Sequence, residues 1–336
     1  MRPEDDHVLP VVRAAELDEP DPARRWLIES LWARAGVGII GGAPKCCKSW
    51  LGLDIALSVA SSSPCLGTFR VHEPGAALVY MAEDALAVVK ARLSSLARHR
   101  RLDLAHLPID VITAPAIRLD LERDQERLAE TVRRHKPRLL LLDPFVRLHR
   151  LDENSAGDVS ALLAYLRALQ REHALCIVVT HHARKNGPAG AEAGQGLRGS
   201  GDLHAWGDSN LYLRRSRGAL VLAVEHRAAA APDPISLALA GDHDDVHLEI
   251  VDSHDAQAEP NGALDAAVLD ALDLAPLSRT ALRKTLRVRN ERLGAVLAEL
   301  AADGRIVRYG DAWGLPHLVP VPPLTQEPER NGIPSP

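Results

Sequence analysis

Short apolar runs alternate with segments of helical periodicity through the central part of the chain. The runs predict buried strands at residues 37–40, 76–81, 138–142 and 174–180, and the periodic segments predict helices at residues 50–60, 84–99 and 158–173. Two further apolar runs, at 210–213 and 219–224, predict a hairpin that turns at 216–218. Because strands that alternate with helices form a sheet covered on both faces, the pattern predicts an α/β fold with a mainly parallel sheet.

The pattern changes towards both ends of the chain. Residues 1–22 are rich in proline and acids and predict a flexible arm before a core at 23–251, and a polar linker at 252–262 follows. Helical periodicity at 263–274, 278–286 and 290–302, then two short strands at 305–308 and 312–315, predict a winged helix-turn-helix domain over 263–318. The proline-rich segment 319–336 predicts a disordered tail.

Composition limits the function classes only mildly. The formal net charge of −5 excludes nucleic-acid binding by overall charge, so such binding would need local basic patches. Four cysteines without a CxxC pattern favour a reducing cytoplasm over a disulfide scaffold. The polar, acidic stretch MRPEDDHVLP is unlike a signal peptide, and no apolar run reaches the length of a membrane span. We therefore expect a cytoplasmic protein with no membrane partner.

The stretch GGAPKCCKSW at 41–50 is typical of a phosphate-binding loop, G-x-x-x-x-G-K-[ST], between a strand and a helix. Gly42, Lys48 and Ser49 hold three of its four fixed positions, and Cys47 stands where the last glycine belongs. In such loops the backbone N–H groups face the phosphates, the lysine neutralises them, and the hydroxyl binds Mg²⁺. The residues expected to contact nucleotide are Gly42, Ala43, Pro44, Lys45, Cys46, Cys47, Lys48, Ser49 and Trp50.

Cys47 is the feature that sets this loop apart. Glycine is favoured there because the backbone must approach the phosphates closely, and a non-glycine residue in a strained loop costs about 1–3 kcal/mol. We expect its thiol, at a helix N-terminus beside Lys48, to favour the thiolate form. The alternative for this stretch is a Lys-Ser helix start that holds no ligand.

Chemically useful residues follow three other predicted strands. Glu83 and Asp84 come after the strand at 76–81, Asp143 after 138–142, and His181 and His182 after 174–180. Taken singly, they could be a helix cap, a turn residue and a solvated or metal-binding histidine pair. Since the carboxyl ends of parallel strands meet at the edge where α/β sheets bind ligands, their order favours one nucleotide site.

This order of motifs resembles the RecA-like ATPases, most closely the RepA-like branch of hexameric replicative helicases and its AAA relatives. The resemblance covers about residues 23–250 and is carried by GGAPKCCKSWLGLDIALSVA, VYMAED, LLLLDPF, VVTHHARK, LRGSGDLHAWGDSNLYLRR and LAVEHR. It implies ATP and Mg²⁺ as cofactors, with Ser49 and the Walker B acid Asp143 at the metal. It further implies Glu83 as the general base and His182 as the γ-phosphate sensor.

The resemblance also implies a homo-oligomeric ring, expected to be a hexamer, in which a neighbouring subunit supplies an arginine. The sequence EHR at 225–227 stands where related rings carry a Lys-x-Arg finger, with Glu225 in place of the lysine. Arg227 is therefore the first choice for the finger and Arg214 the second.

Two segments are candidates for DNA contact. In RecA-like rings the loop equivalent to 183–207 faces a central channel, which suggests Arg184, Lys185 and Arg198; the alternative is a mobile solvent loop. Between residues 279 and 292 six Lys or Arg stand against one acid, and Arg283, Lys284 and Arg287 are the candidates there. A protein-docking module is the alternative for that domain.

Two hypotheses for function follow. The first is an ATP-hydrolysing ring that acts on DNA as a helicase or DNA-dependent motor of the replication type, expected in a mobile element. The second is a nucleotide-binding regulatory or loader protein with weak turnover, which binds DNA or a protein through its winged helix. Cys47 separates them, because a switch tolerates an impaired loop and a motor does not.

Overall fold

The computed structural model describes residues 11–17, 24–151, 156–182, 201–216, 219–242, 244–251, 262–273, 275–286, 288 and 290–317. The chain divides into two compact units, Met1–Asp252 and Ser253–Pro336. Among the described residues, no helix is long and apolar enough to cross a membrane. The greater part of the expected arm, linker and tail lies outside the described residues.

A nine-stranded sheet forms the centre of the first unit, in the order β11-β10-β9-β8-β3-β7-β6-β4-β5. Its strands are β3 (Val37–Gly42), β4 (Ala77–Met81), β5 (Ile109–Val111), β6 (Leu139–Asp143), β7 (Cys176–His182), β8 (Ser209–Ser216), β9 (Ala219–His226), β10 (Ile235–Ala240) and β11 (His247–Ile250). The six strands from β8 to β5 are parallel, and β9, β10 and β11 continue the sheet antiparallel. The predicted mainly parallel sheet and the β8–β9 hairpin are confirmed.

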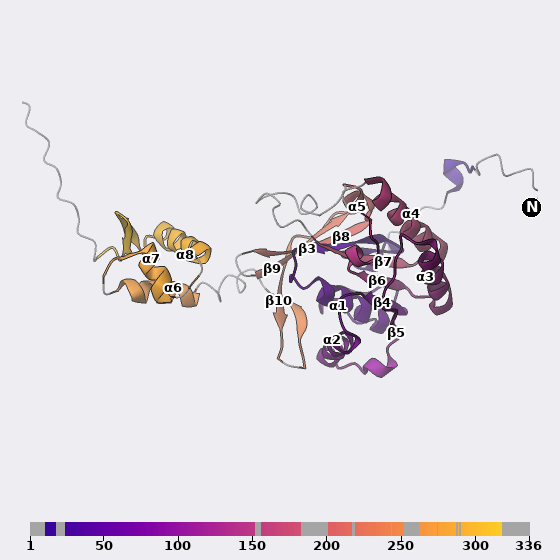
Figure 1. The fold of residues 1–336 in the computed structure, drawn as a ribbon, viewed down its shortest axis with the longest axis horizontal. Coiled ribbons are helices and arrows are strands. Elements are labelled where there is room, and N and C mark those ends of the chain that lie inside the picture. The colour runs from indigo at the N-terminus through magenta and orange to yellow at the C-terminus, as the bar shows by residue number, and fades with distance from the viewer. Residues whose placement is uncertain are drawn as a thin grey trace, which may run out of the picture. The chain divides into compact units, whose positions relative to one another are not determined.

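Helices cover both faces of this sheet (Figure 1). One face packs on α1 (Lys48–Ser61) and α2 (Leu86–His99), and the other on α3 (Glu122–His135), α4 (Ala156–His173) and the short α5 (Gly201–Trp206). The alternation of side chains along each strand produces this division: in β6, Leu139 and Leu141 enter the α1 layer, while Leu140 and Leu142 enter the α4 layer. Strands buried on both faces therefore read as continuous apolar runs in the sequence.

Several elements were not predicted from the pattern. These are the small hairpin of β1 (Trp26–Ile28) and β2 (Trp32–Ala33), and β5, α3, β10, β11 and β12 (Leu277–Ser278). Helix α5 was also not predicted, and it lies within the segment 183–207 that we expected to be a loop. Helix α3 is almost entirely polar, and its buried apolar residues are Leu128 and Val132, so a search for apolar runs does not find it. Strand β7 begins two residues later than the apolar pattern predicts, and it includes His181 and His182, which the pattern places after its end.

The second unit contains α6 (Gly262–Leu272), α7 (Arg279–Leu286), α8 (Asn290–Ala302) and a sheet of β12 (Leu277–Ser278), β14 (Ala312–Gly314) and β13 (Val307–Tyr309), in that order. The three predicted helices and the final hairpin are confirmed. The Ser278 hydroxyl accepts a hydrogen bond from the Ala281 N–H and so caps α7. Gly304, with φ of 70°, ends α8 in the left-handed conformation that favours glycine. Its core consists of Leu264, Val268, Leu272, Leu282, Leu293, Val296, Leu297, Leu300 and Ile306.

Candidate active site

The residues predicted at four strand ends meet in one cavity of about 300 Å³. It opens at the carboxyl edge of the sheet, where β3, β7, β6 and β4 lie side by side. The lining residues are Lys45, Cys46, Cys47, Lys48, Ser49, Trp50, Glu83, Arg92, Asp143 and His182. The structure thus brings a buried cation, a hydroxyl, two carboxylates and an imidazole to the start of α1. This is a donor set suited to phosphate groups with a divalent cation.

In the loop from Gly42 to Lys48, the lysine side chain folds back and binds the backbone of the loop. The Lys48 side chain is 5% exposed, and its Nζ donates to the carbonyl oxygens of Gly42 at 3.0 Å and Ala43 at 2.9 Å. Nδ1 of His182, which pairs with Gly42 across β3 and β7, lies 3.3 Å from the same Nζ. A Cβ on Gly42 would lie 2.4 Å from the carbonyl oxygen of Leu213, so only glycine fits there. Burial lowers the pKa of Lys48.

Cys47 adopts the conformation that favours glycine at its position. Its φ of 64° and ψ of 22° are left-handed, and it stands at the N-cap of α1 without a capping hydrogen bond from its side chain. The expected thiolate is wrong: burial raises the pKa of the Cys47 thiol above its usual value, although Arg215, Arg92 and Lys48 act in the opposite direction. Desolvation of the charged form therefore outweighs the helix end and the nearby cations.

Asp143 fits the role of a metal-binding carboxylate. It is 6% exposed at the end of β6, and the Thr180 hydroxyl on β7 donates to its Oδ1. Burial raises the pKa of Asp143, against the hydroxyls of Ser49 and Thr180, which lower it. Its Oδ2 is buried and makes no hydrogen bond to any described residue. An orphaned carboxylate oxygen beside a serine hydroxyl is an oxygen-only donor set, which suits Mg²⁺.

The two acids after β4 have different surroundings. The Glu83 side chain is 44% exposed, and its carboxylate accepts from Nε of Arg147 at 2.7 Å. The Asp84 carboxylate instead forms a bidentate pair with Arg92, at 2.6 and 3.1 Å. Glu83 lines the cavity and Asp84 does not, so Glu83 is the acid placed to face a bound phosphate.

Two cations near the cavity were missed by sequence reasoning. The Arg92 guanidinium lies 5.7 Å from the centre of the Trp50 ring, and both residues line the cavity. Arg215 donates to the carbonyl oxygen of Lys45 at 3.4 Å. Strand alternation could have identified it, because Leu211 and Leu213 enter the α1 layer and Arg215 continues their face, whereas Arg214 continues that of Tyr212.

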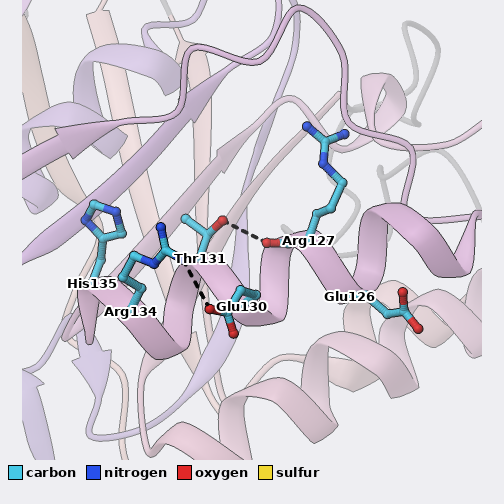
Figure 2. Close-up of a pocket in the computed structure, with 6 residues that line it drawn as sticks. All are labelled: Glu126, Arg127, Glu130, Thr131, Arg134 and His135. Atoms are coloured by element: carbon cyan, nitrogen blue, oxygen red, sulfur yellow. Dashed lines mark hydrogen bonds and ion pairs between the residues drawn. The ribbon is translucent and has the colours of Figure 1, made fainter.

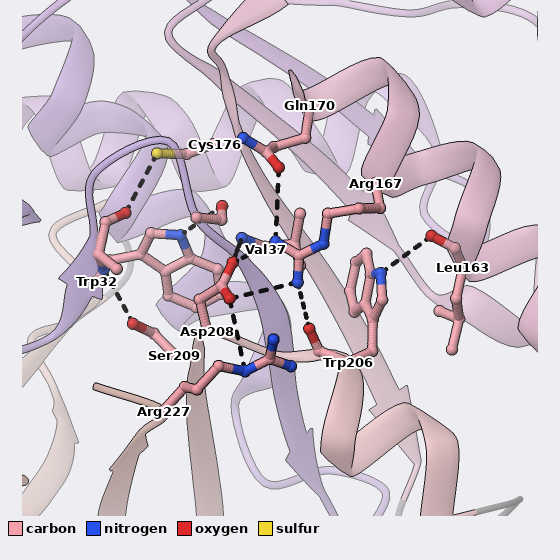
Figure 3. Close-up of polar contacts among 12 residues, drawn as sticks. Trp32, Val37, Leu163, Arg167, Gln170, Cys176, Trp206, Asp208, Ser209 and Arg227 are labelled. Atoms are coloured by element: carbon pink, nitrogen blue, oxygen red, sulfur yellow. Dashed lines mark hydrogen bonds and ion pairs between the residues drawn. The ribbon is translucent and has the colours of Figure 1, made fainter. Parts of the chain in front are cut away.

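Arg227 lies near the amino-terminal ends of the parallel strands, whereas the cavity lies at their carboxyl-terminal ends. It follows His226, which pairs with Ser209 at the beginning of β8, whereas the phosphate loop lies beside the end of β8. Its Nε is 3.8 Å from Asp208, and its Nη2 donates to the carbonyl oxygen of Ala205. Figure 3 shows Asp208 also facing the N–H of Val37 and the guanidinium of Arg167. Arg227 is therefore tied to the segment that follows residues 183–200.

The candidate DNA-binding residues are only partly described. Arg184, Lys185, Arg198 and Arg287 lie outside the described residues. Arg283 and Lys284 are exposed on the last turn of α7 in the second unit.

A second hollow, of about 450 Å³, lies on the surface of α3 (Figure 2). It is lined by Glu126, Arg127, Glu130, Thr131, Arg134 and His135. Glu130 accepts from Arg133 and Arg134 on the same helix, which is typical of a solvated helix face. The smaller cavity at the sheet edge, with its buried lysine and carboxylate, is the better candidate for chemistry.

Comparisons with known proteins place the chain in a family. A comparison with solved structures finds similarity to a crystal structure of the RadB recombinase, at 16% identity and a TM-score of 0.48, over 65% of this chain and 92% of that chain. A comparison with curated proteins finds no match. A family model described as "AAA domain" matches residues 3–188, more than half of the chain and all four strand ends of the cavity. The chain therefore belongs to this AAA domain family.

Proposed function

We propose that the protein is an ATP-hydrolysing ring motor that acts on DNA, of the helicase or DNA-dependent translocase type. The observation that carries the ATPase part is the meeting of Lys48, Ser49, Asp143 and Glu83 in one cavity at the carboxyl edge of a parallel sheet. Each comes from a different part of the chain except the Lys48–Ser49 pair, and each has the chemistry that phosphoryl transfer needs.

In the proposed mechanism, Lys48 leaves the carbonyls of Gly42 and Ala43 to bind the phosphates of ATP. Ser49 and Asp143 would hold Mg²⁺, which would supply charge neutralisation at the phosphate oxygens. Glu83 accepts a proton from the attacking water, and its ion pair with Arg147 orients its carboxylate. His182, in contact with Lys48 across β3 and β7, reports phosphate loss to the loop at 183–207.

The position of Arg227 supports a contribution in trans. Arg227 lies at the end of the parallel strands opposite the cavity of its own subunit, so it does not contact that cavity. Its guanidinium pairs with Asp208 and is half exposed at the surface. Arg214 is on the strand that reaches the subunit's own loop, so it fits a trans role less well. A ring, which we propose to be a hexamer, would bring Arg227 to the neighbouring cavity.

The DNA-binding part of the proposal rests on local charge. Helix α7 carries Arg279, Arg283 and Lys284 with no acid, and the three-helix, three-strand unit around it has the element order of a winged helix. In that arrangement the basic helices meet phosphates and the major groove.

One observation favours the second hypothesis, a nucleotide-dependent switch or loader with weak turnover. Cys47 holds a left-handed conformation, which costs a non-glycine residue about 1–2 kcal/mol. Its side chain also lines the cavity.

Turnover of ATP with and without single-stranded DNA tests the motor, and Cys47→Gly separates it from the switch. For a motor we expect DNA to raise turnover about tenfold or more, and Cys47→Gly to change the stimulated rate by less than about threefold, under 1 kcal/mol of barrier. Malachite-green phosphate release measures both. A basal rate insensitive to DNA that rises more than about tenfold in Cys47→Gly would favour the switch.

Mixed oligomers test the trans arginine. Arg227→Ala and Lys48→Ala proteins are each expected to be inactive, and a mixture is expected to regain part of the activity, because some interfaces combine an intact arginine with an intact loop. Arg214→Ala is the matched control and is expected to keep activity by itself. Mixtures that stay inactive, although size-exclusion chromatography shows mixed assembly, would remove Arg227 from this role.

A further inference from the structure

A cluster of metal-ligating side chains lies away from the cavity, between the end of α2 and the β10–β11 hairpin. His99 is the last residue of α2, Asp245 is in the hairpin turn, and His247 begins β11. One ligand atom from each of the three residues lies within 4.8 Å of the other two. His247 is buried, whereas His99 and Asp245 are exposed, so the cluster is open to solvent on one side.

The surrounding contacts hold the hairpin against α2. The Ser95 hydroxyl on α2 donates to the carbonyl oxygen of Val246 at 2.9 Å. Arg98 forms an ion pair with Asp244 at 3.1 Å, and Arg100 pairs with the buried Asp54 at 2.5 Å. Arg98 and Arg100 are thus each paired with another carboxylate. The Asp245 carboxylate can therefore bind a metal together with the two histidines.

Geometry leaves a ring nitrogen of the buried histidine for a metal. Nδ1 of His247 donates to the backbone carbonyl oxygen of Asp245 at 2.8 Å, so Nε2 is the nitrogen that can bind a metal. The Glu249 carboxylate lies 3.8 Å from this Nε2. The rings of His99 and His247 are stacked, with their centroids 3.4 Å apart.

A small movement brings the three ligand atoms to metal-binding distance. Ligand atoms around tetrahedral zinc lie about 3.4 Å apart, since each is about 2.1 Å from the metal. His99 is stacked on His247 with an angle of 17° between the rings, and its side chain is 41% exposed. Nδ1 of His99 is already 3.6 Å from the Asp245 carboxylate, so we expect the exposed His99 ring, rather than the buried His247, to adjust to a metal.

We propose that His99, Asp245 and His247 bind a divalent transition metal of the zinc class and so anchor the β10–β11 hairpin to α2. Two imidazoles and one carboxylate favour zinc, cobalt or nickel over Mg²⁺, which prefers oxygen ligands alone. The fourth position faces solvent. This site is distinct from the oxygen-ligand site proposed at Asp143, and it needs no nucleotide.

Cobalt and zinc titration of the metal-free, nucleotide-free full chain, in excess Mg²⁺, tests the site. We expect one Co²⁺ per chain with the visible absorption of a tetrahedral centre, and competition by Zn²⁺. His99→Gln, at an exposed position, is expected to weaken binding about tenfold or more, and Asp245→Asn to do the same. His106→Gln is the matched control, because His106 is another exposed histidine paired with an aspartate, Asp103, and should keep full affinity.

Three results would overturn the proposal. The first is affinity in His99→Gln within twofold of the unmodified chain. The second is a thiolate-to-cobalt charge-transfer band, which would assign the ion to Cys46 and Cys47. The third is an unchanged melting temperature on addition of saturating Zn²⁺, because a ligand that binds only the folded state must raise it. Circular dichroism of each variant verifies that it is folded.

Discussion

Lys48→Ala is expected to abolish measurable ATP binding, with a loss of affinity of about a hundredfold or more. Hydrogen bonds to a charged group contribute about 1.5–3 kcal/mol each, and two such bonds to phosphate oxygens correspond to at least that factor. Isothermal titration calorimetry with a non-hydrolysable ATP analogue measures the effect. The structure supports it because Lys48 is the buried lysine of the cavity, and its Nζ lies within reach of the loop.

Lys45→Ala is the matched control for this prediction. Lys45 lies in the same loop and carries the same charge, but it is exposed and also has a left-handed φ, of 64°. Its replacement is expected to change affinity by less than about fivefold, under 1 kcal/mol, since an exposed charge is screened by solvent. If both variants lost affinity equally, overall loop charge rather than the Lys48 contact would explain binding.

Glu83→Gln is expected to leave ATP affinity nearly unchanged and to lower the hydrolysis rate about a hundredfold or more, the usual contribution of a general base. The amide keeps the size of the side chain but does not take a proton from water. Calorimetry measures the binding, and single-turnover phosphate release measures the chemical step. A loss of binding as large as that in Lys48→Ala would assign Glu83 to nucleotide or metal contact instead.

Asp84→Asn is the control for this second prediction. It removes the carboxylate of the next residue, which pairs with Arg92 and does not line the cavity. We expect hydrolysis to fall by less than about fivefold, because an ion pair that is partly exposed contributes little. Equal losses in the two variants would show that the total negative charge after β4 matters, and not the placement of Glu83.

The pattern of apolar runs was sufficient to identify the residues that could form the cavity. Apolar runs predicted β3, β4, β6 and β7, and each was followed or ended by a chemically useful residue, at Lys48–Ser49, Glu83, Asp143 and His182. In a parallel sheet the carboxyl ends share one edge, so the order along the chain was enough to place these residues together. The roles assigned to them remain predictions until the variants are measured.

The order of the strands and the contacts of each side chain depend on the packing of the whole chain. Strand β7 lies between β3 and β6, which brings the Thr180 hydroxyl to Asp143 and the His182 ring to Lys48. Tertiary packing also raises the pKa of the Cys47 thiol, because burial outweighs the nearby charges, and desolvation depends on everything packed around a group. No local pattern contains that information.

The positions of the arginines and of the histidine cluster also depend on both the sequence pattern and the tertiary packing. Strand alternation in the sequence separates Arg214 from Arg215, but which face carries the phosphate loop depends on where α1 packs. His99 and His247 meet because β11 at the far end of the sheet lies against α2, a contact between segments distant in sequence. Sequence periodicity reports whether a face is buried, whereas the partner of that face is chosen by the packing of the whole chain.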